Sequence, residues 1–318
     1  MKLYKGITEL PEAPKNTVAT IGNFDGVHLG HQAILHKVRV HADRIGGAAV
    51  ALTFRPHPLV VLRPVAEPHL LNTYKERTEL LHAHGVQIVV EENFTREFSN
   101  TSPEAFVNDY LVKGLAVKVL YLGYDFTFGK ERAGSVDTLK RLAEERGIEV
   151  HVVPPLEIDG KTVSSSRIRK ALDAGRIEEA RDCLGRPFFL SGLVWRGDGR
   201  GRTIGFPTAN LKMEYRKAPK NGVYATRTLW RGTWYQSVTN VGFNPTFVAQ
   251  AAGEEHPLKV ETHFLDFDED IYGEEIRVEF YQFLRDEKKF SGADELVRQI
   301  HEDVATARTM LGGERFSL

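Results

Sequence analysis

The chain has 318 residues, of which 42% are hydrophobic, and a formal net charge of −1 at pH 7. The length predicts two domains, and the small net charge gives no reason to expect a nucleic acid or an anionic membrane as a partner. We find no apolar run of membrane-spanning length and no signal peptide, and a single cysteine, Cys183, fits a reducing compartment. We therefore expect a cytoplasmic protein.

Strands and amphipathic helices alternate in the first part of the chain. An apolar stripe at helical spacing runs from Leu35 to Ile45, and Ser102 and Ser135 are placed to cap further helices. This alternation predicts a parallel, Rossmann-like sheet with ligands at the carboxyl ends of its strands. The expected strands are Val18–Ile21, Ala48–Phe54, Val86–Glu91, Val117–Leu122 and Ile148–Val153.

The second part of the chain has the composition of short antiparallel strands. Arg231-Gly232 separates two apolar runs and predicts a hairpin turn. A final helix should begin with Ser291 as its N-cap. We expect a small closed β-barrel with a C-terminal helix, and we place the domains at residues 1–184 and 185–318. The expected strands are Phe188–Trp195, Val223–Trp230, Trp234–Val241, Lys259–Phe267 and Glu275–Leu284.

Residues 22–31, Gly-Asn-Phe-Asp-Gly-Val-His-Leu-Gly-His, connect the first expected strand to a helix. Such a glycine-rich turn points backbone N–H groups and the positive end of the helix at a phosphate. His28 and His31 should lie on one side of the helix entrance, and Gly30 lets a ligand approach the backbone. Taken alone, two histidines three residues apart are more often surface or core residues, and a metal site would need a third ligand.

Three other segments of the first domain have polar or aromatic residues next to expected element ends. Serines in Ser164–Arg169 can simply cap a helix, but three hydroxyls with two arginines also suit a triphosphate. The Phe54–Pro58 segment is a rigid loop that contains His57. The aromatic residues of 123–129 could close a core or flank a planar ring.

In the second domain, residues 196–210, Arg-Gly-Asp-Gly-Arg-Gly-Arg-Thr-Ile-Gly-Phe-Pro-Thr-Ala-Asn, combine glycines and arginines. Their amides can wrap phosphates in a mobile loop. Alternating Arg and Gly also occur in RNA-binding segments, although this tract is short. Glu261 and His263 share one face of an expected strand, as ordinary surface residues would. Arg285 could bind a ligand or form a surface salt bridge with Asp286 or Glu287.

These sequence segments resemble those of the bacterial bifunctional riboflavin kinase/FAD synthetase (FMN adenylyltransferase) family, and the resemblance extends over nearly the whole chain. Residues 22–31 are similar to its adenylyltransferase signature, and Ser164–Arg169 to its Ser-Ser-Thr-x-x-Arg signature, with Ser166 in place of Thr. Residues 201–210 are similar to the Gly-Arg-x-x-Gly-Phe-Pro-Thr-Ala-Asn signature of riboflavin kinases. The resemblance implies ATP-dependent phosphorylation of riboflavin to FMN by the barrel. It also implies adenylylation of FMN to FAD, with release of pyrophosphate, by the first domain.

The resemblance also implies the site residues. Glu261 is the expected base of the kinase, and His28 and His31 are the expected catalytic residues of the adenylyltransferase. In the first domain, ATP and its phosphates should contact Gly22, Asn23, Phe24, Asp25, Gly26, Ser164, Ser165, Ser166 and Arg169. The flavin there should contact His57, Asp125, Phe126 and Phe128. In the second domain, ATP should contact Gly199, Gly201, Arg202, Gly205, Thr208 and Asn210. The flavin there should contact Asn240 and Arg285, and Mg²⁺ should bind Thr208 and Asn210.

The expected cofactor is Mg²⁺, with ATP as co-substrate, and the expected partners are riboflavin, FMN, FAD, ATP, ADP and pyrophosphate. We expect neither a nucleic acid nor a membrane as a partner, and the sequence leaves the oligomeric state open. Three alternative functions remain. One is a nucleotidyltransferase that acts on another phosphate or phosphonate, with the barrel as an accessory. The second is a flavin-binding or storage protein without turnover, and the third is a regulatory nucleic-acid role.

Overall fold

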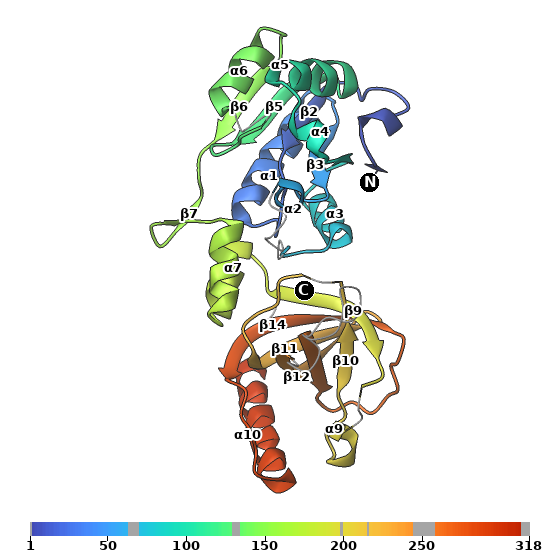
Figure 1. Cartoon of the computed structure of the whole chain (residues 1–318), viewed down its shortest axis with the longest axis vertical. Coiled ribbons are helices and arrows are strands. Elements are labelled where there is room, and N and C mark those ends of the chain that lie inside the picture. The colour runs from blue at the N-terminus through green and yellow to red at the C-terminus, as the bar shows by residue number, and fades with distance from the viewer. Residues whose placement is uncertain are drawn as a thin grey trace. The chain divides into compact units, whose positions relative to one another are not determined.

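The computed structural model describes residues 2–62, 70–128, 134–197, 200–214, 216–243 and 258–312. The chain forms two compact units, Met1–Ser165 and Ser166–Leu318 (Figure 1). Unit 1 is an α/β domain, and unit 2 is an antiparallel β-barrel with additional helices. Within the described residues, no helix is long and apolar enough to span a membrane.

Two helices precede the barrel strands in the sequence, α7 (Ser165–Asp173) and α8 (Ile177–Leu184). Apart from its first residue, α7 falls in unit 2, as does all of α8. The amide of Lys220 donates to the Leu172 carbonyl at 2.8 Å, which attaches the end of α7 to this unit. The domain boundary that we expect between residues 184 and 185 stays a prediction.

The sheet of unit 1 has six strands, and all neighbouring pairs are parallel, which confirms the expected α/β class. Every residue of the central strand β2 is buried, because a parallel sheet is covered on both faces. In sheet order the strands are β1 (Lys2–Tyr4), β4 (Ile88–Asn93), β3 (Ala49–Arg55), β2 (Thr17–Ile21), β5 (Val117–Gly123) and β6 (Glu149–Val153). The carboxyl ends of β3, β2 and β5 therefore lie side by side, at the edge where such sheets bind ligands.

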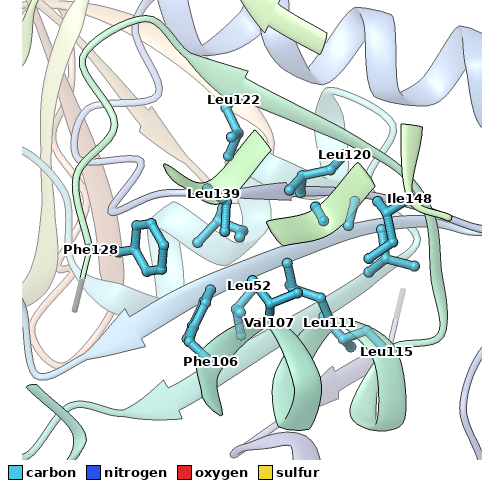
Figure 2. Close-up of a cluster of buried hydrophobic side chains, with 14 of the residues drawn as sticks. Leu52, Phe106, Val107, Leu111, Leu115, Leu120, Leu122, Phe128, Leu139 and Ile148 are labelled. Atoms are coloured by element: carbon cyan, nitrogen blue, oxygen red, sulfur yellow. The ribbon is translucent and has the colours of Figure 1, made fainter. Parts of the chain in front are cut away.

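Alternate residues of the strands face two layers of helices. On one face, α1 and α3 pack Val38 and Leu81 against the sheet. On the other face, the π-helical segment η2 and α6 contribute Leu111 and Leu139 to the cluster in Figure 2, together with Leu120 of β5. The helices in chain order are η1 (Ile7–Glu9), α1 (Leu29–Arg44), α2 (Pro58–Leu62), α3 (Tyr74–Ala83), α4 (Arg96–Ser99), α5 (Pro103–Ala105), η2 (Phe106–Gly114) and α6 (Val136–Glu144). A short antiparallel ribbon follows, β7 (Glu157–Ile158) and β8 (Lys161–Thr162).

Unit 2 contains a closed barrel of six antiparallel strands, which confirms the expected architecture. The expected turn at Arg231-Gly232 joins β11 to β12, and both residues have positive φ (46° and 82°), as a type I′ hairpin turn requires. Around the barrel the strands are β10 (Ala209–Lys212), β13 (Leu258–Phe264), β12 (Thr233–Phe243), β11 (Gly222–Trp230), β14 (Glu275–Arg285) and β9 (Phe188–Trp195).

The interior of the barrel contains a chain of buried hydroxyl groups. Thr226 bonds both Ser237 and Thr239, at 2.8 Å in each case, and Thr228 also bonds Ser237 at 2.8 Å. Thr239 extends the chain to Thr262 at 2.9 Å. All five residues are fully buried, so each hydroxyl has a protein partner where it is removed from bulk water.

The expected helix caps are partly confirmed. Ser102 and Ser135 each accept a hydrogen bond from the amide three residues later, as N-caps do. Ser291 is not the N-cap of the last helix, because α10 (Ala293–Gly312) begins two residues later. The Ser291 hydroxyl and amide instead donate to the Glu295 carboxylate, at 2.8 and 2.9 Å.

Helix α10 covers part of the outer face of the barrel. Ala307 and Leu311 pack against Val223, Ala225 and Tyr281 of β11 and β14. These apolar residues of the helix therefore serve packing.

Candidate active sites

The loop that follows β2 has a strained backbone. Phe24, Gly26 and Val27 have φ values of 50°, 84° and 40°, and a β-branched residue such as Val27 rarely adopts positive φ. Phe24 and Val27 are buried in one hydrophobic cluster with Leu35 of α1. This packing offsets the strain and holds the loop in one conformation at the ligand edge of the sheet.

His28 and His31 lie against each other where this loop enters α1. Their rings stack with centroids 3.7 Å apart, and the His28 Nδ1 accepts a hydrogen bond from the amide of His31. A Cβ on Gly30 would lie 3.2 Å from the His28 ring, so a glycine leaves room for the pair. Nδ1 of His31 is buried and has no hydrogen-bond partner among the described residues. Such a nitrogen is available to a ligand.

Burial lowers the pKa of His31 well below its usual value, and the neighbouring His28 lowers it further. Folded His31 therefore stays neutral in the pH range where a free imidazole takes up a proton. Because the unfolded chain binds that proton more readily, unit 1 should lose stability as the pH falls below about 6.5.

Thermal unfolding of the wild-type and His31→Gln chains, at several pH values from about 7.5 to about 5.5, tests this expectation. The melting temperature of unit 1 should fall more steeply toward acid in the wild type, since glutamine does not titrate. Equal pH slopes in the two proteins would contradict it.

The loop after β3 places His57 in a buried position, with only 5% of its surface exposed. Its amide donates to the Tyr74 hydroxyl at 2.9 Å, and its Nδ1 accepts from the amide of Leu59 at 3.2 Å. Because β3 and β2 are neighbours, this loop lies at the same edge of the sheet as the stacked histidines.

The loop after β5 contains Asp125, Phe126 and Phe128. Asp125 is exposed. Phe128 lies in the hydrophobic cluster of Figure 2, with its ring centroid 5.4 Å from that of Phe106, and Phe126 stacks on Phe128 at 5.8 Å. The two rings thus form part of the hydrophobic core, which is one of the two roles that the sequence left open for this segment. Contacts of these three residues with a flavin stay a prediction.

The serine segment 164–166 is tied to the loop after β2. Ser165 donates from Oγ to the Asp25 carbonyl at 2.8 Å. The carboxylate of Asp25 accepts from the amide of Leu71 at 2.8 Å, so this side chain has a structural partner. Arg169 follows within α7.

Three polar side chains form a row on the outer face of the barrel. Glu261 of β13 pairs in register with Asn210 of β10 on one side and with Asn240 of β12 on the other. Cross-strand partners share a face and are neighbours, so Glu261 lies between two amides. Thr262, the next residue, belongs to the buried hydroxyl chain on the opposite face.

The glycine-rich segment of unit 2 folds tightly beside this row. A Cβ on Gly197 would lie 2.4 Å from the Asn210 amide nitrogen, and a Cβ on Gly201 would lie 2.3 Å from the Phe206 carbonyl oxygen. The Gly201 carbonyl accepts from the Phe206 amide at 2.8 Å, and Arg200–Thr203 form the short helix α9. Residues 200–206 thus form a compact turn, and the mobility that we expected of the longer segment stays a prediction.

The end of this segment packs against β13 and α10. His263 donates from Nδ1 to the Pro207 carbonyl at 2.8 Å. The Phe206 ring lies edge-on to His263 and His301, with centroid distances of 5.3 and 5.0 Å. Burial lowers the pKa of His263, which keeps its ring neutral. Arg202 is exposed.

The oxygen atoms expected to bind Mg²⁺ are the Thr208 hydroxyl and the Asn210 side-chain carbonyl, and both residues are half-buried. Gly197 and Gly201 leave space beside them, since a Cβ on Gly201 would lie 3.5 Å from the Thr208 hydroxyl. Neutral oxygen ligands suit Mg²⁺ when phosphates complete its shell, so these residues fit the ion. Within the described residues, no group of three or more His, Cys, Asp or Glu side chains could hold a metal. Gly199 lies outside the described residues.

Arg285, at the end of β14, forms an ion pair with Asp303 of α10. Its Nε and Nη2 donate to the carboxylate at 2.7 to 3.1 Å, and its Nη1 donates to the Asp286 carbonyl at 3.0 Å. The Asp303 side chain is only 6% exposed and that of Arg285 is 21% exposed. The partner of Arg285 is therefore a buried carboxylate on another element, rather than the neighbouring Asp286 or Glu287.

Asp303→Ala should destabilise unit 2 by about 3 kcal/mol, because it leaves a largely buried guanidinium without its counter-charge. Denaturant unfolding of the two chains measures the change. Arg308→Ala is a matched control, since Arg308 of the same helix makes a two-point contact with Asp266 at 2.7 Å. That pair is exposed, so its loss should cost much less. Equal effects of both substitutions would contradict the buried-pair interpretation.

Two family models match the chain, FAD synthetase over residues 10–167 and riboflavin kinase over residues 184–311. Similar proteins include the bifunctional riboflavin kinase/FMN adenylyltransferase of Listeria monocytogenes, 39% identical over 92% of each chain. The enzyme of the same name from Escherichia coli K12 is 38% identical over 98% of each chain. A solved structure from Streptococcus pneumoniae, described as a macrolide-efflux protein, is 31% identical, covers 99% of each chain and has a TM-score of 0.85.

These matches confirm the resemblance drawn from the motifs. The family models follow the same order along the chain as the α/β unit and the barrel, and the two relatives named by function extend over nearly the whole chain. The chain therefore belongs to the family of bifunctional riboflavin kinase/FMN adenylyltransferase enzymes, with a FAD synthetase domain followed by a riboflavin kinase domain.

Proposed function

We propose that unit 2 transfers the γ-phosphate of ATP to riboflavin, giving FMN and ADP. Unit 1 then transfers the adenylyl group of another ATP to FMN, giving FAD and pyrophosphate. The observation that carries the proposal is the position of Glu261 between Asn210 and Asn240. This arrangement places a carboxylate beside side chains that can bind ATP and the hydroxyl group of riboflavin. We place these reactions in the cytoplasm, since the buried Cys183 is a free thiol.

In unit 2, Glu261 is the proposed base. It would accept the proton of the riboflavin 5′-hydroxyl while that oxygen attacks the γ-phosphorus and the bond to the β-phosphate oxygen breaks. Asn240 and Arg285 would contact the flavin, and Arg285 would also fix the adjoining end of β14 through Asp303. The residues proposed to contact the ATP phosphates are Gly199, Gly201, Arg202 and Gly205.

Thr208 and Asn210 would hold Mg²⁺ together with ATP. When bound, the ion neutralises charge on the phosphates and orients them. The protein groups contribute neutral oxygen atoms and a fixed position next to Glu261, which stands beside Asn210 in the strand register.

In unit 1 no protein nucleophile is needed, because a phosphate oxygen of FMN attacks the α-phosphorus of ATP and pyrophosphate leaves. Catalysis then rests on positioning and charge stabilisation. His28 and His31 would donate hydrogen bonds to the α-phosphate. The amides of residues 22–26 and the side chains of Ser164 and Ser165 would hold the other phosphates. Ser166 and Arg169 fall in unit 2, and their expected contacts with ATP stay predictions. The proposed flavin contacts are His57, Asp125, Phe126 and Phe128.

Gly201→Ala should lower the rate of riboflavin phosphorylation about tenfold or more, since the new methyl group would collide with the Phe206 carbonyl and open the turn before Thr208. Adenylylation of supplied FMN should be unchanged. Gly312→Ala is the control, because a Cβ there meets nothing within 4 Å. Full kinase activity of Gly201→Ala would contradict the role of this turn.

Incubation of the pure protein with riboflavin, ATP and Mg²⁺, followed by chromatography of the flavins, tests the proposal. Appearance of FMN and then FAD is the expected result. FAD formation from supplied FMN without riboflavin phosphorylation would favour a nucleotidyltransferase with an accessory barrel. Bound riboflavin without any product would favour a flavin-binding protein.

A further inference from the structure

Arg77 of α3 links two loops of unit 1 that carry motif residues. Its Nη1 donates to the carbonyl of Asn23 at 3.2 Å and to the carbonyl of Phe54 at 3.1 Å. Asn23 belongs to the strained loop after β2, and Phe54 lies at the carboxyl end of β3, directly before the loop of His57. One guanidinium nitrogen therefore bridges two neighbouring strand ends at the ligand edge of the sheet.

The guanidinium group of Arg77 has a fixed orientation. Its Nη2 donates to the Glu91 carboxylate of β4 at 2.9 Å, and its Cζ lies 4.9 Å from the centre of the Tyr74 ring. Arg77 and Glu91 are each only 3% exposed. Burial lowers the pKa of Arg77, and the Glu91 carboxylate opposes that shift. A planar guanidinium group that is held by an ion pair and an aromatic ring can donate to several acceptors at once.

The first turn of α3 also holds the loop after β3. The Tyr74 hydroxyl accepts a hydrogen bond from the His57 amide at 2.9 Å. Thr73 and Glu76 form a capping box, in which each side chain binds the backbone of the other, so the start of this helix is itself fixed.

We propose that Arg77 is a positioning residue of the adenylyltransferase site, which sets the spacing between the loop after β2 and the loop after β3. The proposal rests on the function proposed for unit 1. Arg77 acts through the carbonyls of Asn23 and Phe54 and does not itself touch a substrate. The bridge holds the phosphate-binding amides of one loop at a constant distance from His57 in the other, and it opposes relaxation of the strained backbone.

Arg77→Lys is the main test, because lysine keeps the charge next to Glu91 but lacks the planar fork needed for all three contacts. Its kcat for FAD formation from FMN should fall about 10- to 100-fold, with a smaller change in KM. Hydrogen exchange should become faster in both loops, at residues 22–28 and 54–57. Riboflavin phosphorylation in the same sample should be unchanged, which shows that unit 2 is intact.

Leu142→Ala is the matched control for lost stability. Leu142 is buried in α6 and takes no part in the hydrogen bonds of Arg77, so its substitution should weaken unit 1 without accelerating exchange selectively in the two loops. Tyr74→Phe provides a milder variant, which removes only the acceptor of the His57 amide. It should accelerate exchange at residues 54–57 and leave residues 22–28 unchanged.

Arg77→Lys with exchange in both loops like that of Leu142→Ala, and with wild-type kcat, would overturn the proposal. A wild-type chain that forms no FAD would instead refute the proposed function of unit 1. The exchange comparison would still decide whether Arg77 couples the two loops, because it does not depend on turnover.

Discussion

The Glu261→Gln chain should lose riboflavin phosphorylation while it still converts supplied FMN to FAD. Glutamine preserves the size and the hydrogen-bonding shape of the side chain between Asn210 and Asn240, but it cannot accept the proton of an alcohol. General-base catalysis contributes about 10²- to 10⁴-fold in rate, so kcat for FMN formation should fall within that range. The binding of ATP should change much less.

The two activities of one preparation can be measured separately, with riboflavin or with FMN as the flavin substrate. Glu269→Gln serves as the control, since Glu269 is an exposed glutamate of the same unit, and both its activities should match the wild type. Equal damage to both activities by Glu261→Gln would contradict separate sites, and normal phosphorylation would exclude Glu261 as the base.

His31→Gln should have the opposite pattern, with loss of FAD formation and normal riboflavin phosphorylation. The substitution removes a half-buried ring, which stacks on His28 and whose buried Nδ1 has no hydrogen-bond partner among the described residues. Loss of one preorganised donor to a transition-state oxygen typically lowers kcat about 10²- to 10³-fold. We expect a decrease of that size in the rate of FAD formation from FMN.

His36→Gln tests whether such a loss depends on position. His36 is an exposed residue of the same helix, α1, so its replacement should leave FAD formation unchanged. A His31→Gln chain that kept wild-type kcat would show that His31 has no catalytic role, even in a chain of this family.

The main sheet and the barrel could be predicted because their strands follow simple rules. Strands such as β2 are buried on both faces and therefore have continuous apolar sequences. The strands that escaped prediction are short. β1 (Lys2–Tyr4) has three residues and β10 (Ala209–Lys212) has four. These are too few residues for a hydrophobic pattern typical of strands to be recognised. Their pairing depends on neighbouring strands, β4 in one case and β9 and β13 in the other.

The sequence predicts which segments contain the candidate site residues, but not which of these residues the fold brings together. Nothing in the sequence indicates that Asn210 and Asn240 flank Glu261, because strand register depends on the closed barrel. The burial of Arg77 could not be predicted from the sequence for another reason. It lies in a run of polar residues that indicates a solvent-facing turn, yet it is buried because Glu91 and two backbone carbonyls pair with it. Only the assembled sheet brings these partners together.

The hydroxyl chain inside the barrel limits how this sequence can diverge. If Thr226 alone became valine, Ser237 and Thr239 would each lose one of two buried partners, and each lost hydrogen bond costs about 0.5–1.5 kcal/mol. Replacing linked positions together removes donor and acceptor at once and avoids most of that cost. Among relatives, residues at these positions should therefore covary as a group, either all hydroxyl-bearing or all apolar, and single exchanges should be rare.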